Sequence, residues 1–260
     1  MMLFKNKRKR DELFREFYNQ NKLYFAAIKK HHNEEYYKEI LELLGEFKAD
    51  LNFKQVLDIG SGTGQFLKLL KKRWSWIKAK GVEVSLIGVK MHPVGWGVRA
   101  DAKNMPFGDN QFDFAFLIDV IEHVTKPKEV LREAIRVIKK GGYLILRSPN
   151  YLSPVHLRRE YLTAWLKGIY DIFKEGATDL DKAPFLTPSL NSKVFEGGDE
   201  DANRAVFAIS LKSYLEKYGN VELYKTSTGF GGRVPLVERL NNIPIFQHFG
   251  PSCLIVFQKK

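Results

Sequence analysis

A short apolar segment that runs directly into a glycine-rich loop is the feature that most constrains the fold of this chain. Residues 55–59 read QVLDI, residues 60–64 read GSGTG, and an amphipathic segment follows over 65–73. A strand that enters a glycine turn and leaves as a helix brings its backbone close to a ligand and points free N–H groups of the helix N-terminus at it. The segment therefore predicts an α/β fold with a ligand site at the carboxyl end of this strand.

Strand and helix patterns alternate as far as residue 147. Apolar runs predict further strands at 79–84, 97–100, 112–118 and 143–147. Pro127 suits the first turn of a helix, and the glycine pair 141–142 is expected to end that helix. Strands that are apolar on both faces are typical of a parallel sheet covered by helices on both sides.

The two ends of the chain are expected to add to this core. Residues 12–48 have apolar side chains at helical spacing. The stretch 13–28 is unusually aromatic, which fits either packing against the sheet or a lid that contacts a substrate. A helix at 209–218 and strands at 221–226 and 253–258 would complete a seven-stranded, mostly parallel sheet.

An insertion is predicted after Pro149, where the alternating pattern breaks until residue 208. Loops between core elements are usually short, so a stretch of this length is expected to have its own role. It contains a predicted helix around 157–173 and an acidic run at 196–201. Its aromatic residues are Tyr151, Tyr161, Trp165, Tyr170, Phe173 and Phe185. We expect this segment to choose the substrate.

The chain is thus predicted to have four parts. They are a helical N-terminal cap or lid (1–50), a ligand-binding core (51–150), an inserted substrate-recognition or lid segment (151–208) and the C-terminal part of the core sheet (209–260).

Acidic residues come at the carboxyl ends of four successive predicted strands: Asp58, Glu83, Asp101 and Asp119. Carboxyl ends of parallel strands meet at one crevice, so these side chains are expected to point into the same site. Asp58 precedes a G-x-G-x-G loop, whereas dinucleotide enzymes use G-x-G-x-x-G. A carboxylate there repels a pyrophosphate but attracts an ammonium group. Glu83 can accept both hydroxyls of a ribose, and Asp101 an exocyclic adenine amine.

These segments resemble the motifs of class I S-adenosylmethionine (SAM)-dependent methyltransferases, in particular the group that includes ubiquinone and menaquinone biosynthesis enzymes. The stretches, within residues 54–150, are VLDIGSGTGQF, GVEVS, ADAKNMPF, FDFAFLIDVIEHV and LREAIRVIKKGGYLILRSPN. The resemblance implies a Rossmann-like fold, SAM as the methyl donor and S-adenosylhomocysteine (SAH) as the product. It says almost nothing about the methyl acceptor.

The resemblance also implies a set of cofactor-binding positions. The methionine part would be held by Asp58, Gly60 and Gly62, with Ser61, Thr63 and Gly64 completing the loop; the ribose by Glu83, next to Val84; and the adenine by Asp101, Ala102 and Met105. Asp119 would lie near the sulfonium and the incoming acceptor.

Candidate catalytic residues follow the fourth predicted strand. His123 lies at the mouth of the crevice, where it either acts as a general base beside Asp119 or only orients its loop. Asp119, Glu122 and His123 partly match the metal-binding D/E-x-x-E-H of small-RNA 2′-O-methyltransferases. The next histidine, His156, has a spacing that matches poorly, so no metal is expected. Cys253 lies in an apolar strand and is expected to be a buried thiol rather than a nucleophile.

The other histidines of the core and N-terminal region are given no catalytic role. His31 and His32 are expected to be solvated on a charged helix, and His92 to cap a helix.

The net charge of +12 leaves the acceptor open. The basic residues are scattered among acidic ones, which fits a solvated surface, but an RNA footprint would also be basic. We expect a small-molecule acceptor, with RNA as the first alternative and a non-catalytic SAM-binding protein as the second. No run is long enough to span a bilayer, and a single cysteine excludes an internal disulfide, so a cytoplasmic enzyme is expected.

Overall fold

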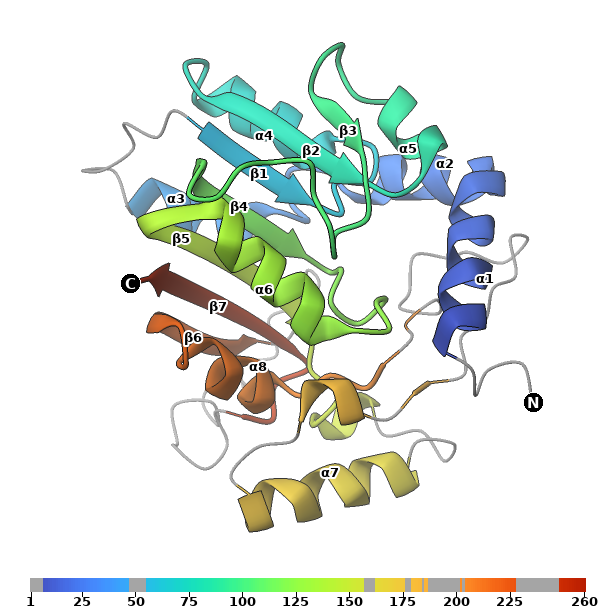
Figure 1. The fold of residues 1–260 in the computed structure, drawn as a ribbon, viewed down its shortest axis with the longest axis vertical. Coiled ribbons are helices and arrows are strands. Elements are labelled where there is room, and N and C mark those ends of the chain that lie inside the picture. Colours follow the sequence, from blue (N-terminus) through green and yellow to red (C-terminus); the bar gives the residue numbers. More distant parts are fainter. Residues whose placement is uncertain are drawn as a thin grey trace.

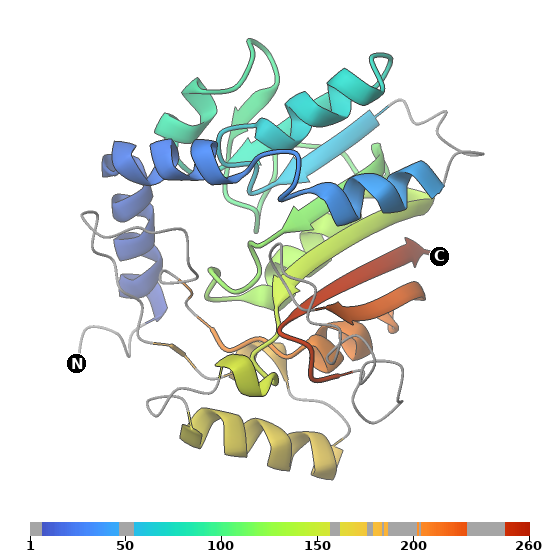
Figure 2. The same ribbon diagram turned by 180° about the vertical axis from the view of Figure 1, so that it is seen from behind.

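The computed structural model describes residues 7–46, 55–156, 162–175, 179–183, 185–186, 202, 204–227 and 248–260. Within these residues a seven-stranded sheet has the strand order β3-β2-β1-β4-β5-β7-β6, and helices cover both of its faces (Figures 1 and 2). The strands β1 to β5 run parallel, and β7 is antiparallel to both β5 and β6. This arrangement confirms the predicted Rossmann-like, mostly parallel sheet.

Except for β5, which begins five residues before the predicted start at residue 143, the strands begin and end close to the predicted positions. They are β1 (Gln55–Ile59), β2 (Lys78–Glu83), β3 (Gly97–Arg99), β4 (Phe112–Ile118), β5 (Ile138–Pro149), β6 (Gly219–Ser227) and β7 (Ser252–Lys259). The predicted bounds of β1 and β4 agree with the structure, because each is a largely apolar run that ends at a glycine or an acidic residue.

The helices differ more from the sequence-based expectation. They are α1 (Lys7–Gln20), α2 (Lys22–His31), α3 (Lys38–Glu46), α4 (Gln65–Arg73), α5 (Leu86–Lys90), α6 (Pro127–Val137), α7 (Leu162–Glu175) and α8 (Ala208–Leu215). The region predicted as helical over 12–48 is therefore three helices. Asn21 separates the first two, because its side chain accepts a hydrogen bond from the Tyr24 N–H and caps α2.

Two apolar cores lie on the two faces of the sheet. On one face α6 and α8 pack on the sheet, and on the other α3 and α4 do (Figures 1 and 2). Leu57 of β1 belongs to the first core and its neighbour Val56 to the second. Burial of successive side chains on opposite faces is what the continuous apolar strands predicted.

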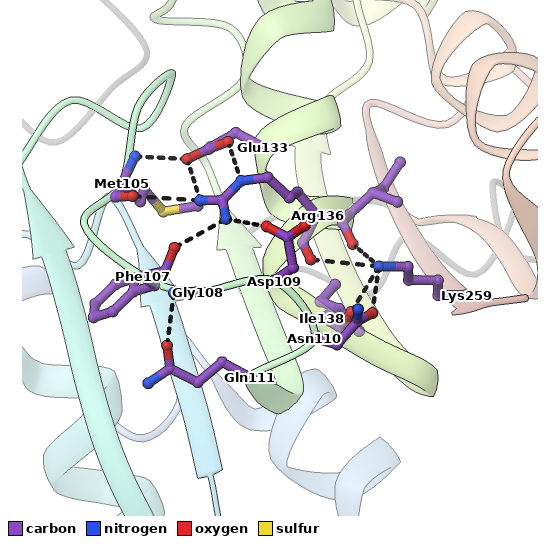
Figure 3. A network of polar contacts seen from close by, with 11 residues as sticks. Met105, Phe107, Gly108, Asp109, Asn110, Gln111, Glu133, Arg136, Ile138 and Lys259 are labelled. Atoms are coloured by element: carbon purple, nitrogen blue, oxygen red, sulfur yellow. Dashed lines mark hydrogen bonds and ion pairs between the residues drawn. The ribbon is translucent and has the colours of Figure 1, made fainter.

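The glycine pair 141–142 does not end a helix, so this prediction was wrong. Helix α6 ends at Val137, and both glycines lie inside β5, where Gly141 has a φ of +75°. Distant residues satisfy the carbonyl groups at the helix end, because the N–H of Asn110 donates to the Arg136 carbonyl (3.0 Å) and the Lys259 Nζ to the Ile138 carbonyl (2.8 Å). Figure 3 shows these groups gathered around the end of α6.

The insertion contains a helix, as predicted: within the described residues it is α7, and residues 157–161, where the predicted helix begins, lie outside them. Helix α7 lies close to the chain that enters α8, since a Cβ on Gly168 would lie 2.2 Å from the Phe207 ring. The Trp165 indole donates to the Leu152 carbonyl (3.0 Å), and Tyr170 is exposed. Tyr161 and the acidic run 196–201 lie outside the described residues, as does the side chain of Phe173. Among the described helices, none has the length and apolar character to cross a membrane.

Candidate functional site

A cavity of about 170 Å³ lies where the carboxyl ends of the central strands meet helices α1 and α2. One wall comes from the core, including Asp58, Gly60, Glu83 and Asp119. The opposite wall comes from the N-terminal helices, including Phe14, Tyr18, Phe25 and Ile28. Figure 1 shows α1 and α2 beside the ends of these strands. The aromatic N-terminal stretch, which allowed two interpretations, therefore both packs on the core and lines the cavity.

The loop between β1 and α4 has a backbone that requires glycine. Gly60, Gly62 and Gly64 have φ values of +74°, +52° and +72°, in the left-handed region. A Cβ on Gly60 would lie 2.4 Å from Val120, whereas one on Gly62 would find its nearest neighbour, Ile28, at 3.8 Å. Gly62 thus borders open cavity space, and Gly60 allows the close approach of the loop after β4.

The side chain of His92 contacts this loop and supports it, a role that the sequence analysis missed. Its buried ring is 3.1 Å from the Gly62 carbonyl through Nε2 and 3.3 Å from the Ser61 hydroxyl. Burial lowers the pKa of His92. The ring fills space opposite Gly81 and Gly97, where a Cβ would lie within 3.0 Å of it. Glycines inside two predicted strands were the available signal for a large buried side chain nearby.

Asp58 and Glu83 are buried carboxyl groups on one side of the cavity. Glu83 accepts hydrogen bonds from the N–H groups of Gly62 (3.0 Å) and Ser85 (2.8 Å). Among the described residues, none donates a hydrogen bond to Asp58. Burial, together with the charge of Glu83, raises the pKa of Asp58 to about 8, and burial raises that of Glu83 to about 7. A buried carboxylate that lacks a donor is suited to a cationic ligand group.

Asp101 also lines the cavity and is already held by the protein. Arg15 of α1 forms an ion pair with it, and the N–H of Lys103 donates to it (2.9 Å). The neighbouring Ala102 lines the cavity. Asp101 thus links the loop after β3 to α1, which the strand pattern alone could not predict.

Met105 does not reach the cavity, contrary to the sequence-based expectation. Its side chain is buried in the core, and its N–H donates to Glu133 (2.7 Å). Arg136 joins the same group of contacts by donating to the Phe107 carbonyl (2.9 Å), as Figure 3 shows. Thr63 and Gly64 also lie outside the lining, whereas Ser61 and Val84 belong to it.

Asp119, which directly follows β4, has a positive φ and is held by two residues. Its φ is +53°, a region that non-glycine residues seldom occupy outside functional sites. Its Oδ2 accepts hydrogen bonds from the Arg147 side chain (3.1 and 2.5 Å) and from the Tyr36 hydroxyl (2.6 Å). Burial disfavours the charged guanidinium, but Asp119 keeps the pKa of Arg147 above its ordinary value. The opposite oxygen, Oδ1, has no partner among the described residues.

His32 belongs to the same cluster, so the prediction that it is solvated was wrong. It lines the cavity, and its ring stacks on Tyr36 with 4.1 Å between centroids. Arg147 lies over the Tyr36 ring at 4.3 Å. The Tyr37 hydroxyl is 3.1 Å from His32 Nδ1. Burial lowers the pKa of His32 to about 4, so its imidazole is neutral near pH 7.

His123 lines the cavity. Its Nε2 is 3.7 Å from the fully buried carboxylate of Glu122, which accepts a hydrogen bond from the Ser148 hydroxyl (3.2 Å). His156 instead hydrogen-bonds the Pro251 carbonyl (2.8 Å). Within the described residues, no three His, Cys, Asp or Glu side chains are grouped as metal ligands. Cys253 is a buried thiol, and burial raises its pKa.

The described part of the insertion lies outside the cavity lining. None of its described residues between 151 and 208 borders the cavity, and the wall that faces the core comes from α1 and α2 instead. The expectation that the insertion itself contacts the substrate therefore gains no support from the described residues.

The strand order, the antiparallel β7 and the glycine loop beside two buried carboxyl groups define the Rossmann-like fold of class I methyltransferases. The model of the methyltransferase domain family matches residues 29–177, more than half of the chain. The chain therefore belongs to the methyltransferase domain family, which confirms the resemblance found in the sequence.

Curated relatives match about half of the chain. A demethylmenaquinone methyltransferase of Thermotoga maritima is 29% identical over 147 residues, which cover 52% of this chain and 61% of the relative. A ubiquinone biosynthesis O-methyltransferase of Pseudomonas aeruginosa is 28% identical over 152 residues, covering 55% and 62%. The match thus spans less than two thirds of each of these relatives.

Solved structures share the fold over most of the chain. A SAM-dependent methyltransferase of Archaeoglobus fulgidus superposes with a TM-score of 0.54 at 19% identity, covering 91% of this chain and 99% of the other. A SAM-dependent methyltransferase of Thermotoga maritima, described as a possible histamine N-methyltransferase, has a TM-score of 0.54 at 22% identity, covering 96% and 99%.

Proposed function

We propose that this chain binds SAM in the cavity and transfers its methyl group to a small-molecule acceptor. The observation that carries the proposal is Asp58, a buried carboxyl group to which none of the described residues donates a hydrogen bond, placed beside the glycine loop and Glu83. A carboxylate in this position favours the ammonium of an amino-acid-like ligand and disfavours a pyrophosphate. Membership of the methyltransferase family supports the same ligand.

The residues present fit SAM along the length of the cavity. Asp58 would hold the ammonium group and Glu83 the ribose hydroxyls, with Gly60 and Gly62 allowing close approach. Ala102 and the loop at Asp101 would border the adenine. When bound, SAM supplies an electrophilic methyl group on a positively charged sulfur.

The contribution of the protein to methyl transfer is mainly alignment and exclusion of water. Positioning of a nucleophile can supply most of the rate enhancement of an in-line displacement. Asp119, fixed by Arg147 and Tyr36, presents a negative charge to the acceptor end of the cavity. His123 would remove a proton from an acceptor that attacks through a hydroxyl or ammonium group. The aromatic side chains of α1 and α2 keep water out.

A small-molecule acceptor is supported by the relatives and by the cavity. Two relatives are named for methylation steps of quinone biosynthesis, whose acceptors are small molecules. The cavity lies behind α1 and α2 and has an aromatic wall, as is usual for small-molecule sites.

Thermal melting with and without ligand tests cofactor binding. SAM or SAH at a hundredfold excess over its dissociation constant should add about 2.7 kcal/mol of stability. Gly62→Arg should abolish this gain, because its side chain would enter the cavity. Gly95→Arg is the matched control, since Gly95 also has a positive φ but has no neighbour within 4 Å. An unchanged melting curve of the native protein at saturating SAH would refute cofactor binding.

A further inference from the structure

Arg204 holds both ends of the segment that carries His123. Its backbone N–H donates to the Glu122 carbonyl (2.9 Å), and its guanidinium donates twice to the Thr125 carbonyl (2.9 and 2.5 Å). Between these two carbonyls lie His123 and Val124, which both line the cavity. One residue outside the cavity therefore fixes the segment at either end.

The same guanidinium contacts another part of the insertion, to which Arg204 itself belongs. Its Nη1 donates to the Ala183 carbonyl (2.6 Å), and its Cζ lies 4.0 Å from the centre of the Phe185 ring. Arg10 of α1 also lies over this ring, at 4.5 Å, and donates to the Leu186 carbonyl (2.6 Å). The segment 183–186 of the insertion thus contacts two buried arginines from separate parts of the chain.

Arg10 and Arg204 are both connected to segments that line the cavity. Arg10 is followed by Asp11, which lines the cavity and accepts a hydrogen bond from the Thr125 hydroxyl (2.5 Å). Thr125 in turn accepts from Arg204 through its carbonyl. The insertion, the N-terminal helix and the His123 segment therefore meet in one buried network.

Burial of a charged guanidinium costs free energy, which indicates that the contacts of the Arg204 side chain have a specific role. All hydrogen bonds from Arg204 to described residues go to carbonyl oxygens, and burial lowers the pKa of Arg204 to about 10. The planar fork of arginine can hold two carbonyls in a fixed relation, which an apolar side chain cannot.

We propose that Arg204 is a positioning residue, which places the His123 segment from outside the cavity and lets the insertion act on the site through that segment. The inference rests on the proposed function, because it assigns the cavity to SAM and His123 to the acceptor. The insertion would then act on the site indirectly, through residues 122–125, and not through direct contact of its described residues with the substrate.

The test compares Arg204→Lys and Arg204→Ala with Lys259→Met in the full chain. Lys259 is a suitable control because its ammonium also binds backbone carbonyls, those of Ile135 (2.7 Å) and Ile138 (2.8 Å), at the opposite end of the sheet (Figure 3). Calorimetry measures SAH affinity, and NMR follows the ring signal of His123, assigned by its loss in His123→Gln. Melting curves establish that each variant is folded.

Both Arg204 variants should weaken SAH binding by about fivefold or more, the lower end of usual coupling between separate sites. They should also shift the His123 signal, whereas Lys259→Met should lower the melting temperature alone. Added guanidinium ion at millimolar concentration should restore SAH affinity in Arg204→Ala, and equal concentrations of urea or sodium chloride should not. Arg204→Lys keeps the charge and provides the comparison if Arg204→Ala does not fold.

The outcomes separate this inference from the proposed function. If the native protein does not bind SAH, the assignment of the cavity is wrong. If the native protein binds SAH, and the folded Arg204 variants bind it equally well with an unchanged His123 signal, only the positioning role is overturned.

Discussion

Ionisation of Asp58 and Glu83 links ligand binding to pH at the residue scale. Their pKa values, about 8 and about 7 in the free protein, mean that both are partly protonated near pH 7. Binding of an ammonium and of ribose hydroxyls requires the ionised forms, so binding should release protons. SAH affinity should therefore rise from pH 6.5 to 8.5, by at most about tenfold per pH unit for each proton released. Calorimetry in buffers of different ionisation enthalpy measures the release.

The same pKa values predict the stability of the free protein. Both carboxyl groups have folded-state pKa values above their unfolded values, so their protonated forms favour the folded state and stability falls as pH rises toward 8. The lowered pKa of His32 acts in the opposite sense, but only below about pH 6.5. Asp58→Asn should consequently raise the melting temperature of the free protein more at pH 8 than at pH 6.5, while weakening SAH binding. Equal effects at the two pH values would contradict the raised pKa.

Substitutions at two glycines with similar backbone angles distinguish the cost of backbone strain from the cost of steric overlap. Gly60 and Gly95 have φ values of +74° and +78°, but only Gly60 has a close neighbour, Val120. Gly95→Ala should cost about 1–2 kcal/mol of stability, from the left-handed backbone alone. Gly60→Ala should cost roughly 1–3 kcal/mol more, from overpacking against Val120. Urea denaturation measures both, and partial recovery by Val120→Ala in the Gly60→Ala background would confirm the contact.

The sequence predicted those site residues whose signal is local. Asp58 and Glu83 stand at fixed offsets from a glycine loop and a strand end, and both lie in the cavity. His92 and Arg204 were not predicted, because each acts through partners far away in the chain. His32 stacks on the nearby Tyr36, but its place at the site depends on Asp119 and Arg147, which hold Tyr36 from other parts of the chain. The side chain of His92, for example, is 30 residues from its partner Gly62. Such roles follow from packing and not from spacing.

At the scale of elements, the structure adds most to the description of the N-terminal helices. The sequence predicted helical residues over 12–48 but not the break at Asn21 that turns α2 across the core. The Ser85 hydroxyl donates to the Tyr18 carbonyl (2.7 Å), and the Leu86 N–H donates to the Asn19 side chain (3.1 Å). Both contacts attach the end of α1 to the start of α5, and the sequence pattern of a single amphipathic helix contains neither of them.

The cap at Asn21 makes α2 testable as a cavity wall. Asn21→Ala should remove the hydrogen bond to the Tyr24 N–H and cost about 1 kcal/mol. Because Phe25 and Ile28 of α2 line the cavity, the loss should also weaken SAH binding. Hydrogen exchange should increase in α2 and stay unchanged in α4. Asn104→Ala, in an exposed loop, is the control; equal SAH affinities in both variants would show that α2 is not part of the binding wall.

The sequence predicted the boundaries of strands and helices where the local sequence determines them. It missed the boundaries that a tertiary contact determines. The bounds of β1 and α4 follow from an apolar run, a glycine loop and a basic helix end. The end of α6 instead depends on Asn110 and Lys259, which lie outside the helix. The glycine pair 141–142 alone therefore could not predict that α6 ends at Val137.

At the scale of the whole molecule, the net charge of +12 must be set against the charges at the cavity. Asp58, Glu83 and Asp119 all border the cavity, and the last of them is paired with Arg147. The ionised forms of Asp58 and Glu83, which ligand binding requires, would repel the phosphates of a nucleic acid. The basic surface would therefore attract RNA without bringing it to the methyl donor, and such binding should weaken steeply with salt.

Labelled SAM in a cell extract, fractionated into RNA, protein, lipid and small molecules, tests this distinction. We expect the label in the small-molecule or lipid fraction, unchanged by prior ribonuclease treatment and by a rise in salt from 50 to about 200 mM, a range over which non-specific RNA binding falls by orders of magnitude. Asp119→Asn should lower the transfer, because it removes the charge that Arg147 and Tyr36 hold at the acceptor end. Label that resists protease, is released by ribonuclease and disappears with salt would instead identify RNA as the acceptor. It would require that a base or ribose reach past α1 and α2, and therefore that these helices move.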